Sequence, residues 1–346
     1  MNDARARLRY LDETIDLLFP GPGAPRPYTL LPHRLLPRRL VPRAWWHPGG
    51  RLIVPSGRNG IENHLSEVFG APVRVTLRVR PALRANRKPI LEARGPDGPI
   101  AFVKVGDTDL TRELVAHEAR TLDLLADVPL KTVVPPAVLH HGSWRGLSVL
   151  ALTPLPVRRG RIPGVVLTDA IAEIAHIPSD PAPDRAPPGN PIHGNPTRVT
   201  PHPAARAFEA SAQAAGKPVR PEPLSGRGFA WHGDLTPWNV SRGPDGRLLV
   251  WDWERFGTGV PLGFDAVHHF FQRTLRRDDP ATAARACVAR ALRVLAPFGL
   301  SASESRLTAL RYLITLADRH AADGHTPLGP PELWLNPVVD SQETLL

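Results

Sequence analysis

The sequence predicts an α+β fold, because runs of strand length dominate the first half of the chain and helical patterns follow them. Three apolar runs have the length of strands: 73–79, 89–93 and 100–105. The last two are joined by Gly-Pro-Asp-Gly at 95–98, a typical hairpin turn. Near the C-terminus, 281–295 and 302–319 repeat apolar residues at the period of a helix. The second of these begins with Ser-Ala-Ser-Glu at 301–304, which has the spacing of a capping box.

The composition is that of an ordinary soluble globular protein. The 346 residues are enough for one large domain or two medium ones, and 42% are hydrophobic while 22% are charged. No apolar stretch approaches the roughly 20 residues that span a bilayer, and residues 1–18 lack the pattern of a signal peptide. The single cysteine, Cys287, excludes an internal disulfide and a cysteine-based zinc cluster. We therefore expect a cytoplasmic protein with no membrane partner.

The formal charge of +10 is concentrated near the N-terminus. Residues 1–100 hold 17 Lys and Arg against 8 Asp and Glu, an excess that could attract a nucleic acid or an anionic surface. However, only four basic residues are lysines and proline reaches 41, a bias that indicates codon composition rather than selection for a ligand. A nucleic-acid partner is therefore not expected.

The first sixty residues predict a basic, proline-rich N-terminal extension, 1–60. Apolar residues recur at the helical period in 4–18. From 19 to 60, Pro and Gly interrupt short apolar pieces, so we expect order only where these pieces pack on the body of the protein. A short helix is expected at 61–70, where it ends at a glycine.

Helical periodicity predicts a buried ion pair. Glu118 lies in the middle of the apolar stripe of the expected helix 109–125. A buried carboxylate must lose its charge or find a cation, and Lys104, on the preceding strand, is the nearest candidate. The alternative is that Lys104 is a solvated residue at a strand edge.

A polar cluster is predicted around a second Gly-Pro-Asp-Gly turn, at 243–246. The open end of that hairpin would bring Asn239 near Asp252, and the loop before it would place Asp234 near both. Two carboxylates and an amide supply the hard oxygen ligands that magnesium prefers, which indicates phosphoryl transfer. The alternative is that they are polar loop residues that cap a hairpin.

His-Gly-Asp at 232–234 with Asn239, followed by Asp-Trp-Glu at 252–254, resembles the catalytic and metal-binding motifs of the aminoglycoside phosphotransferase and choline kinase superfamily. These enzymes are relatives of the protein kinases. The resemblance implies a two-lobed protein-kinase-like fold, with a small antiparallel β N-lobe at 61–153 and a mainly helical C-lobe at 154–346.

The resemblance also implies a role for each site residue. Asp234 would be the catalytic base that accepts the proton of the substrate hydroxyl. Asn239 and Asp252 would be the ligands of Mg²⁺, and the pair of Lys104 and Glu118 would bind around the phosphates of ATP or GTP.

One segment departs from the pattern of protein kinases, because 80–89 contains no glycine where a glycine-rich loop would cover the phosphates. Either backbone amides bind the phosphates there, or the side chains of Arg84, Asn86, Arg87 and Lys88 do. A solvated turn with no ligand is the alternative.

Further elements follow along the chain. Strands are expected at 133–139 and 147–152, separated by a turn at His140 to Ser143, and 153–156 resembles the hinge between kinase lobes. After the hinge, helices are expected at 164–177 and 204–215.

The region near 160–225 is where the superfamily builds its acceptor pocket. Its acidic residues are scattered singly, which does not favour a polycationic antibiotic. A surface insertion is the alternative, above all for the proline-rich loop 178–203.

Histidines and one aspartate near the motifs are interpreted as structural. Asp265 resembles the aspartate that supports the catalytic loop in the superfamily. His232 is expected to be a hydrogen-bonding residue of that loop. His268 and His269 are expected to serve packing rather than chemistry.

The sequence therefore predicts an ATP- and Mg-dependent phosphotransferase that acts on a hydroxyl of a small molecule, an antibiotic or a metabolite. The alternative is a nucleotide-binding pseudokinase with a binding or regulatory role.

Overall fold

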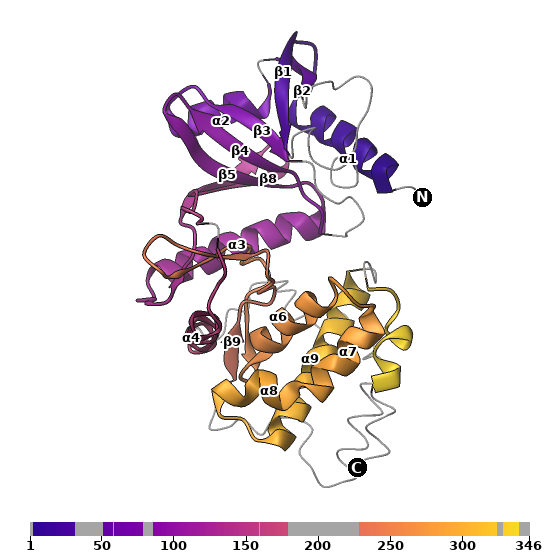
Figure 1. The fold of residues 1–346 in the computed structure, drawn as a ribbon. Coiled ribbons are helices and arrows are strands. Elements are labelled where there is room, and N and C mark those ends of the chain that lie inside the picture. The colour runs from indigo at the N-terminus through magenta and orange to yellow at the C-terminus, as the bar shows by residue number, and fades with distance from the viewer. Residues whose placement is uncertain are drawn as a thin grey trace, which may run out of the picture. The chain divides into compact units, whose positions relative to one another are not determined.

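The computed structural model describes residues 3–31, 51–57, 59–78, 86–158, 160–178, 228–323 and 328–338. The chain divides into two compact units, one formed by Met1–Asp123 with Pro136–Pro154 and the other by Leu124–Pro135 with Leu155–Leu346. Strands dominate the first unit and helices the second (Figure 1). The predicted α+β class is confirmed.

Seven strands form the sheet of the first unit, in the order β2-β1-β3-β4-β5-β8-β7. They are β1 (Ala24–Leu31), β2 (Arg51–Ser56), β3 (Arg74–Arg78), β4 (Ile90–Gly95), β5 (Gly98–Gly106), β7 (Val138–Trp144) and β8 (Leu147–Leu152). Neighbouring strands are antiparallel, except that β1 runs parallel to β3. The predicted hairpin between the second and third runs is β4-β5, whose register sets Ile90 opposite Lys104.

Three helices accompany this sheet: α1 (Asp3–Leu18), α2 (Ile61–Phe69) and α3 (Asp109–Ala126). Leu18 and Phe19 at the end of α1 and Leu65 of α2 belong to the same buried core as Leu77 and Val103 of the sheet. α2 ends at Gly70, whose left-handed φ of 63° lets its N–H bond the last turn. The N-terminal helices expected from periodicity are thus confirmed.

The proline-rich extension contributes two strands that the sequence did not predict. β1 and β2 pair antiparallel, with Ala24 opposite Ser56. Successive N–H groups of a strand point to opposite sides. Prolines at alternate positions, as at 25 and 27, therefore remove donors from one side of the strand only. The proline-rich composition of this segment therefore does not prevent β1 from pairing with β2.

The strand predicted at 133–139 is wrong as a single element, and so is the turn predicted at His140 to Ser143. The stretch divides into β6 (Val133–Val134), in the second unit, and β7, in the first. The histidines lie within β7, and the turn to β8 is formed by Arg145 and Gly146. Both have positive φ, 50° and 78°, as a two-residue hairpin loop requires.

Two small sheets belong to the second unit. One has the order β10-β11-β6 and includes the hairpin of β10 (Val240–Arg242) and β11 (Leu248–Val250). The other pairs β9 (Phe229–Trp231) with β12 (Gly257–Val260). The turn predicted at 243–246 is confirmed, since Gly243 N–H donates to the carbonyl of Arg247 over 2.8 Å.

Helices form most of the second unit. They are α4 (Gly164–Ala175), α6 (Phe264–Thr274), α7 (Pro280–Ala289), α8 (Ala291–Leu295) and α9 (Ala302–Ala322), with 3-10 turns at Ala296–Phe298 and Pro331–Leu333. The capping box of α9 is present as predicted, with the Ser301 hydroxyl and the Glu304 carboxylate each accepting the other's backbone N–H. The single helix predicted at 281–295 is instead two helices that meet at Arg290.

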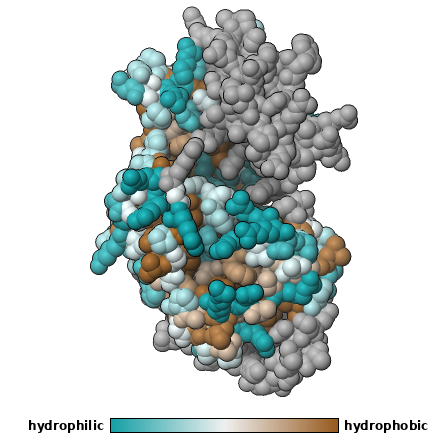
Figure 2. Space-filling model, in the orientation of Figure 1, coloured by the Kyte–Doolittle hydropathy of each residue, from teal (hydrophilic) through white to brown (hydrophobic). Residues whose placement is uncertain are grey.

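Three predicted features lie outside the described residues: Arg84, the helix at 204–215 and nearly all of the loop 178–203. Among the helices of the described segments, none combines the length and the hydrophobicity needed to cross a bilayer. On the face drawn in Figure 2, hydrophilic and hydrophobic residues are interspersed.

Candidate active site

The loop that carries Asp234 runs between β9 and β10 and turns at Gly233. Gly233 has a φ of 80°, and a Cβ added there would overlap the carbonyl oxygen of Arg255. A residue with a side chain at this position would force either the loop or the segment around Arg255 to move. The loop backbone therefore packs directly against the segment that follows Asp252.

Asp265, at the start of α6, holds the loop by two hydrogen bonds. Its carboxylate accepts the N–H of His232 over 2.7 Å and that of Gly233 over 3.3 Å. Burial raises the pKa of Asp265 to about 7, against the effect of these donors. The expected role of Asp265 as a support of the loop agrees with this geometry.

His232 is a structural residue of the loop. Its Nδ1 accepts the N–H of Asp234 over 3.1 Å, and its ring lies 4.5 Å from the ring of Trp253. Burial lowers the pKa of His232 to about 4, so that the ring is neutral near pH 7 and acts as an acceptor.

Asp234 and Asn239 contact each other directly. The Asn239 amide Nδ2 lies 3.0 Å from both the backbone carbonyl and the carboxylate Oδ2 of Asp234. Both of these are acceptors only, so the NH₂ group must face them. The Asn239 Oδ1 is therefore directed away from Asp234 and remains suitable as an oxygen ligand.

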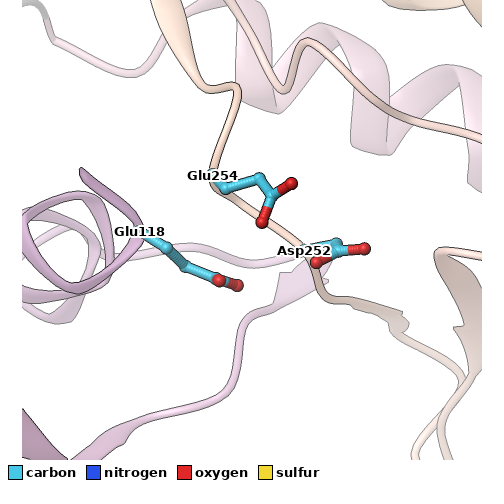
Figure 3. Close-up of side chains that lie close together, drawn as sticks. All are labelled: Glu118, Asp252 and Glu254. Carbon is cyan, nitrogen blue, oxygen red and sulfur yellow. The ribbon is translucent and has the colours of Figure 1, made fainter. Parts of the chain in front are cut away.

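Asp252 follows β11 in a left-handed conformation, with a φ of 74°. The hairpin pairs the carbonyl of Asn239 with the N–H of Trp251 over 3.1 Å. Burial lowers the pKa of His232, and the hydrogen bond to His268 lowers that of Asp234; the charge of Asp252 lies close enough to oppose both decreases without reversing them. Figure 3 shows Asp252 with Glu254 on the same segment. The hairpin thus brings Asp252 into electrostatic range of Asp234.

His268 of α6 contacts the carboxylate of Asp234, which the sequence analysis did not foresee. Its Nε2 lies 3.1 Å from Asp234 Oδ1, and its Nδ1 lies 2.9 Å from the hydroxyl of Tyr312 on α9. The expectation that His268 serves packing rather than chemistry did not include this polar contact with Asp234. One signal was available: His268 follows Asp265 by three residues, and positions three apart on a helix share a face.

Burial and hydrogen bonding oppose each other at Asp234. Burial by itself would raise the pKa of Asp234, but the hydrogen bond to His268 and the charge of Arg319 outweigh it and hold the pKa below its ordinary value. The Asp234 side chain is nevertheless 32% exposed. An ionised carboxylate that remains accessible suits a base that meets a substrate hydroxyl.

Arg319 of α9 is a second residue that the sequence analysis missed. Its guanidinium donates to the carbonyl of Gly233 over 2.6 Å, 86 residues away in the chain. It also lies over the ring of Trp231, at 5.8 Å from the centroid. α9 therefore binds the loop backbone through a carbonyl, in addition to the N–H groups that Asp265 binds.

The predicted pair of Lys104 and Glu118 is confirmed within the first unit. Lys104 Nζ lies 2.7 Å from Oε1 and 2.5 Å from Oε2 of Glu118. The Glu118 side chain, on α3 (Figure 3), is fully buried, and the Lys104 side chain is 7% exposed. The pair satisfies a carboxylate that the helix would otherwise bury among apolar groups.

Of the residues proposed for the phosphate loop, Arg84 lies outside the described residues. Arg87 is directed to α1, where its guanidinium contacts Glu13 at 3.1 Å and lies 4.7 Å from the centre of the Tyr10 ring. The backbone carbonyl of Asn86 is 3.5 Å from the ammonium of Lys88. The Arg87 guanidinium is therefore engaged with α1.

Solved structures similar to this chain are kinases that act on small molecules. A candidate fructosamine-3-kinase from Haemophilus somnus 129PT is 15% identical, with a TM-score of 0.51 over 81% of this chain and 96% of its own. The chain has a two-lobed, protein-kinase-like fold. Its first unit corresponds to the small antiparallel β N-lobe and its second to the mainly helical C-lobe. No family model matches the sequence of the chain, and no curated protein sequence matches it.

Two further structures belong to the superfamily that the motifs resemble. The ADP-bound aminoglycoside phosphotransferase APH(2'')-Ib is 12% identical over 82% of this chain and 97% of its own, with a TM-score of 0.46. The choline kinase LicA from Streptococcus pneumoniae is 12% identical over 83% of this chain and 98% of its own, with a TM-score of 0.45.

Proposed function

We propose that the protein is an ATP- or GTP-dependent, Mg-dependent phosphotransferase that acts on a hydroxyl of a small molecule. One observation carries the proposal: an accessible, ionised Asp234 is oriented by Asn239, in a loop held by Asp265 and Arg319. The kinase-like fold is consistent with it.

Asp234 would act as the base in this reaction. The acceptor oxygen would attack the γ-phosphorus, the bond from that phosphorus to the β-phosphate oxygen would break, and Asp234 would receive the hydroxyl proton. The nucleoside diphosphate would leave with the electron pair of the broken bond.

Asn239 and Asp252 would hold Mg²⁺, because an amide oxygen and a carboxylate match its preference for hard oxygen donors. When bound, the metal would neutralise phosphate charge. Lys104, oriented by Glu118, would add a fixed positive charge for the phosphates. The Lys104 side chain has no oxygen atom, so unlike Asn239 it would not be a ligand of the metal.

The Asp234→Asn variant tests the proposed base. It keeps the size of the side chain and its oxygen acceptor but cannot take the proton, so the rate of phosphoryl transfer should fall by about 100-fold or more. Consumption of Mg·ATP would be measured with a panel of hydroxylated metabolites and antibiotics, beside thermal unfolding of both proteins. Undiminished turnover by folded Asp234→Asn would remove the base assignment.

A nucleotide-binding pseudokinase is the second candidate, favoured by the glycine-free segment 80–89. A thermal shift with Mg·ATP or Mg·GTP, combined with no turnover of any acceptor or of water, would support it. No thermal shift with either nucleotide would contradict both candidates.

A further inference from the structure

Two buried side chains of the second unit, Tyr312 and His268, form a continuous series of hydrogen bonds from α9 to Asp234 in the catalytic loop. The hydroxyl of Tyr312 is 2.9 Å from His268 Nδ1, and His268 Nε2 is 3.1 Å from Asp234 Oδ1. Tyr312 and His268 are both 0% exposed. These hydrogen bonds are not needed to hold the loop backbone, because Asp265 and Arg319 already bind it.

The chemistry of the partners fixes where the proton of His268 resides. An ionised carboxylate only accepts hydrogen bonds, so Nε2 must carry the proton and donate it to Asp234. Burial lowers the pKa of His268, which leaves the ring a single proton. Nδ1 is then an acceptor, and the Tyr312 hydroxyl is the donor that selects this tautomer.

Two donors on different elements therefore define the plane of the Asp234 carboxylate. His268 of α6 donates to Oδ1, and Asn239 of the loop donates to Oδ2. Each carboxylate oxygen has further lone pairs, and the side chain retains its 32% exposure. An acceptor hydroxyl can approach these lone pairs without displacing either donor.

The spacing of α6 couples this arrangement to the loop backbone. Asp265, which binds the N–H groups of His232 and Gly233, precedes His268 by three residues. One face of one helix thus holds both the backbone and the carboxylate of the proposed base. A displacement of α6 would move the two together.

From this geometry we infer that His268 is a positioning residue for Asp234, acting as a neutral Nε2–H donor whose tautomer is set by Tyr312. The inference rests on the proposed role of Asp234 as the base. His268 keeps its proton throughout the reaction, and the hydroxyl proton goes to Asp234 alone.

Two substitutions at His268 separate its two contacts. The amide nitrogen of a glutamine can occupy the place of Nε2 and donate to Asp234, whereas the shorter asparagine reaches only the place of Nδ1, near Tyr312. Mg·ATP turnover, with water as the acceptor, should therefore fall by about 10- to 100-fold in His268→Asn. His268→Gln should retain at least about tenfold more activity than His268→Asn, with both variants folded.

Tyr312→Phe removes only the hydroxyl and should lower turnover by about three- to tenfold, the effect of one hydrogen bond. Thr274→Val on α6 and Thr315→Val on α9 are matched controls. Each deletes a hydroxyl that binds a carbonyl of its own helix, so neither should change turnover.

Nitrogen-15 NMR of histidine-labelled protein supplies a readout that does not depend on turnover. The His268 ring, assigned from its loss in His268→Gln, should be a neutral Nε2–H tautomer at pH 7 and should become charged only at a lower pH than an ordinary histidine.

The outcomes separate the inference from the proposed function. An Nδ1–H tautomer, a charged ring at neutral pH, or equal activities of the Gln and Asn variants would overturn the inference. Full activity of Asp234→Asn would instead show that Asp234 is not the base, and His268 would then have no catalytic group to position.

Discussion

At the scale of single residues, the second unit uses neutral and charged groups for different purposes. His232 and His268 are buried and have lowered pKa values because burial disfavours their charged forms. The Asp234 carboxylate stays ionised, because the hydrogen bond to His268 and the charge of Arg319 lower its pKa. Neutral His268 gives the carboxylate a hydrogen bond of fixed direction, and neutral His232 binds the backbone N–H of Asp234, without either adding a net charge.

The pKa of His232 predicts a loss of stability in acid. The ring titrates at about 6.5 when unfolded and at about 4 when folded, so below pH 6.5 the unfolded state binds more protons. The stabilisation is complete above about pH 6.5 and is lost as the pH falls toward about 4, by about 3 kcal/mol in total. The free energy of unfolding, measured by denaturant titration at several pH values, should show this dependence.

His232→Asn provides the comparison, because its amide oxygen can accept the N–H of Asp234 in place of Nδ1 but does not titrate. Between about pH 4 and 6.5, the slope of stability with pH should decrease by up to about 1.4 kcal/mol per pH unit. An unchanged slope would mean that His232 is already protonated in the folded protein.

The pair of Lys104 and Glu118 predicts non-additive stability effects. Lys104→Met removes the ammonium that contacts both oxygens of a fully buried carboxylate, at a cost of about 3 to 5 kcal/mol. Adding Glu118→Leu should recover much of this loss while nucleotide turnover stays low, because the cation proposed for the phosphates is still absent. Additive losses in the double-mutant cycle would show that the two side chains do not interact.

At the scale of elements, the predictable features are those that local sequence encodes. Asp234, Asn239 and Asp252 flank one hairpin turn, and Glu118 stands in one apolar helix stripe, so spacing alone locates them. Arg319 contacts the loop directly and Tyr312 contacts it through His268, both from α9, which is distant in sequence. Nothing near these two residues in the chain signals the contact, whereas His268 had only its three-residue spacing from Asp265 to indicate it. β1 was missed because its prolines hide the strand pattern.

The turn at Gly233 predicts a contrast between two glycines with similar backbones. Gly233 and Gly299 have φ values of 80° and 76°, but no heavy atom lies within 4 Å of the Cβ position at Gly299. Both alanine variants should lose about 1 kcal/mol from the left-handed backbone. Gly233→Ala should lose about 2 to 4 kcal/mol more, because its methyl group meets Arg255.

Denaturant unfolding and Mg·ATP turnover of both alanine variants test this contrast. Turnover should fall only in Gly233→Ala, where the loop must move. Similar stability and turnover in the two variants would mean that the loop tolerates a displacement from the Arg255 carbonyl.

At the scale of the whole molecule, the N-terminal extension is part of the first unit rather than an appendage. Leu11, Leu18 and Phe19 are at most 5% exposed and belong to the core cluster of the sheet. Each buried side chain of this size contributes about 1.5 to 3 kcal/mol.

Removal of residues 1–58 should therefore destabilise the first unit by about 5 kcal/mol or more. Hydrogen exchange followed by mass spectrometry should show lost protection in β4 and β5. Full protection of these strands in the truncated protein would assign the extension to a role outside the fold.

The left-handed backbone at Asp252 has an evolutionary consequence. Aspartate, asparagine and glycine adopt this conformation at least cost, so these three residue types are favoured at position 252. Glycine removes the oxygens proposed to bind a metal, and asparagine removes their charge. If metal binding is under selection, homologues of this chain should vary less at position 252 than at Arg145, which has a similar backbone in a surface turn but no proposed chemistry.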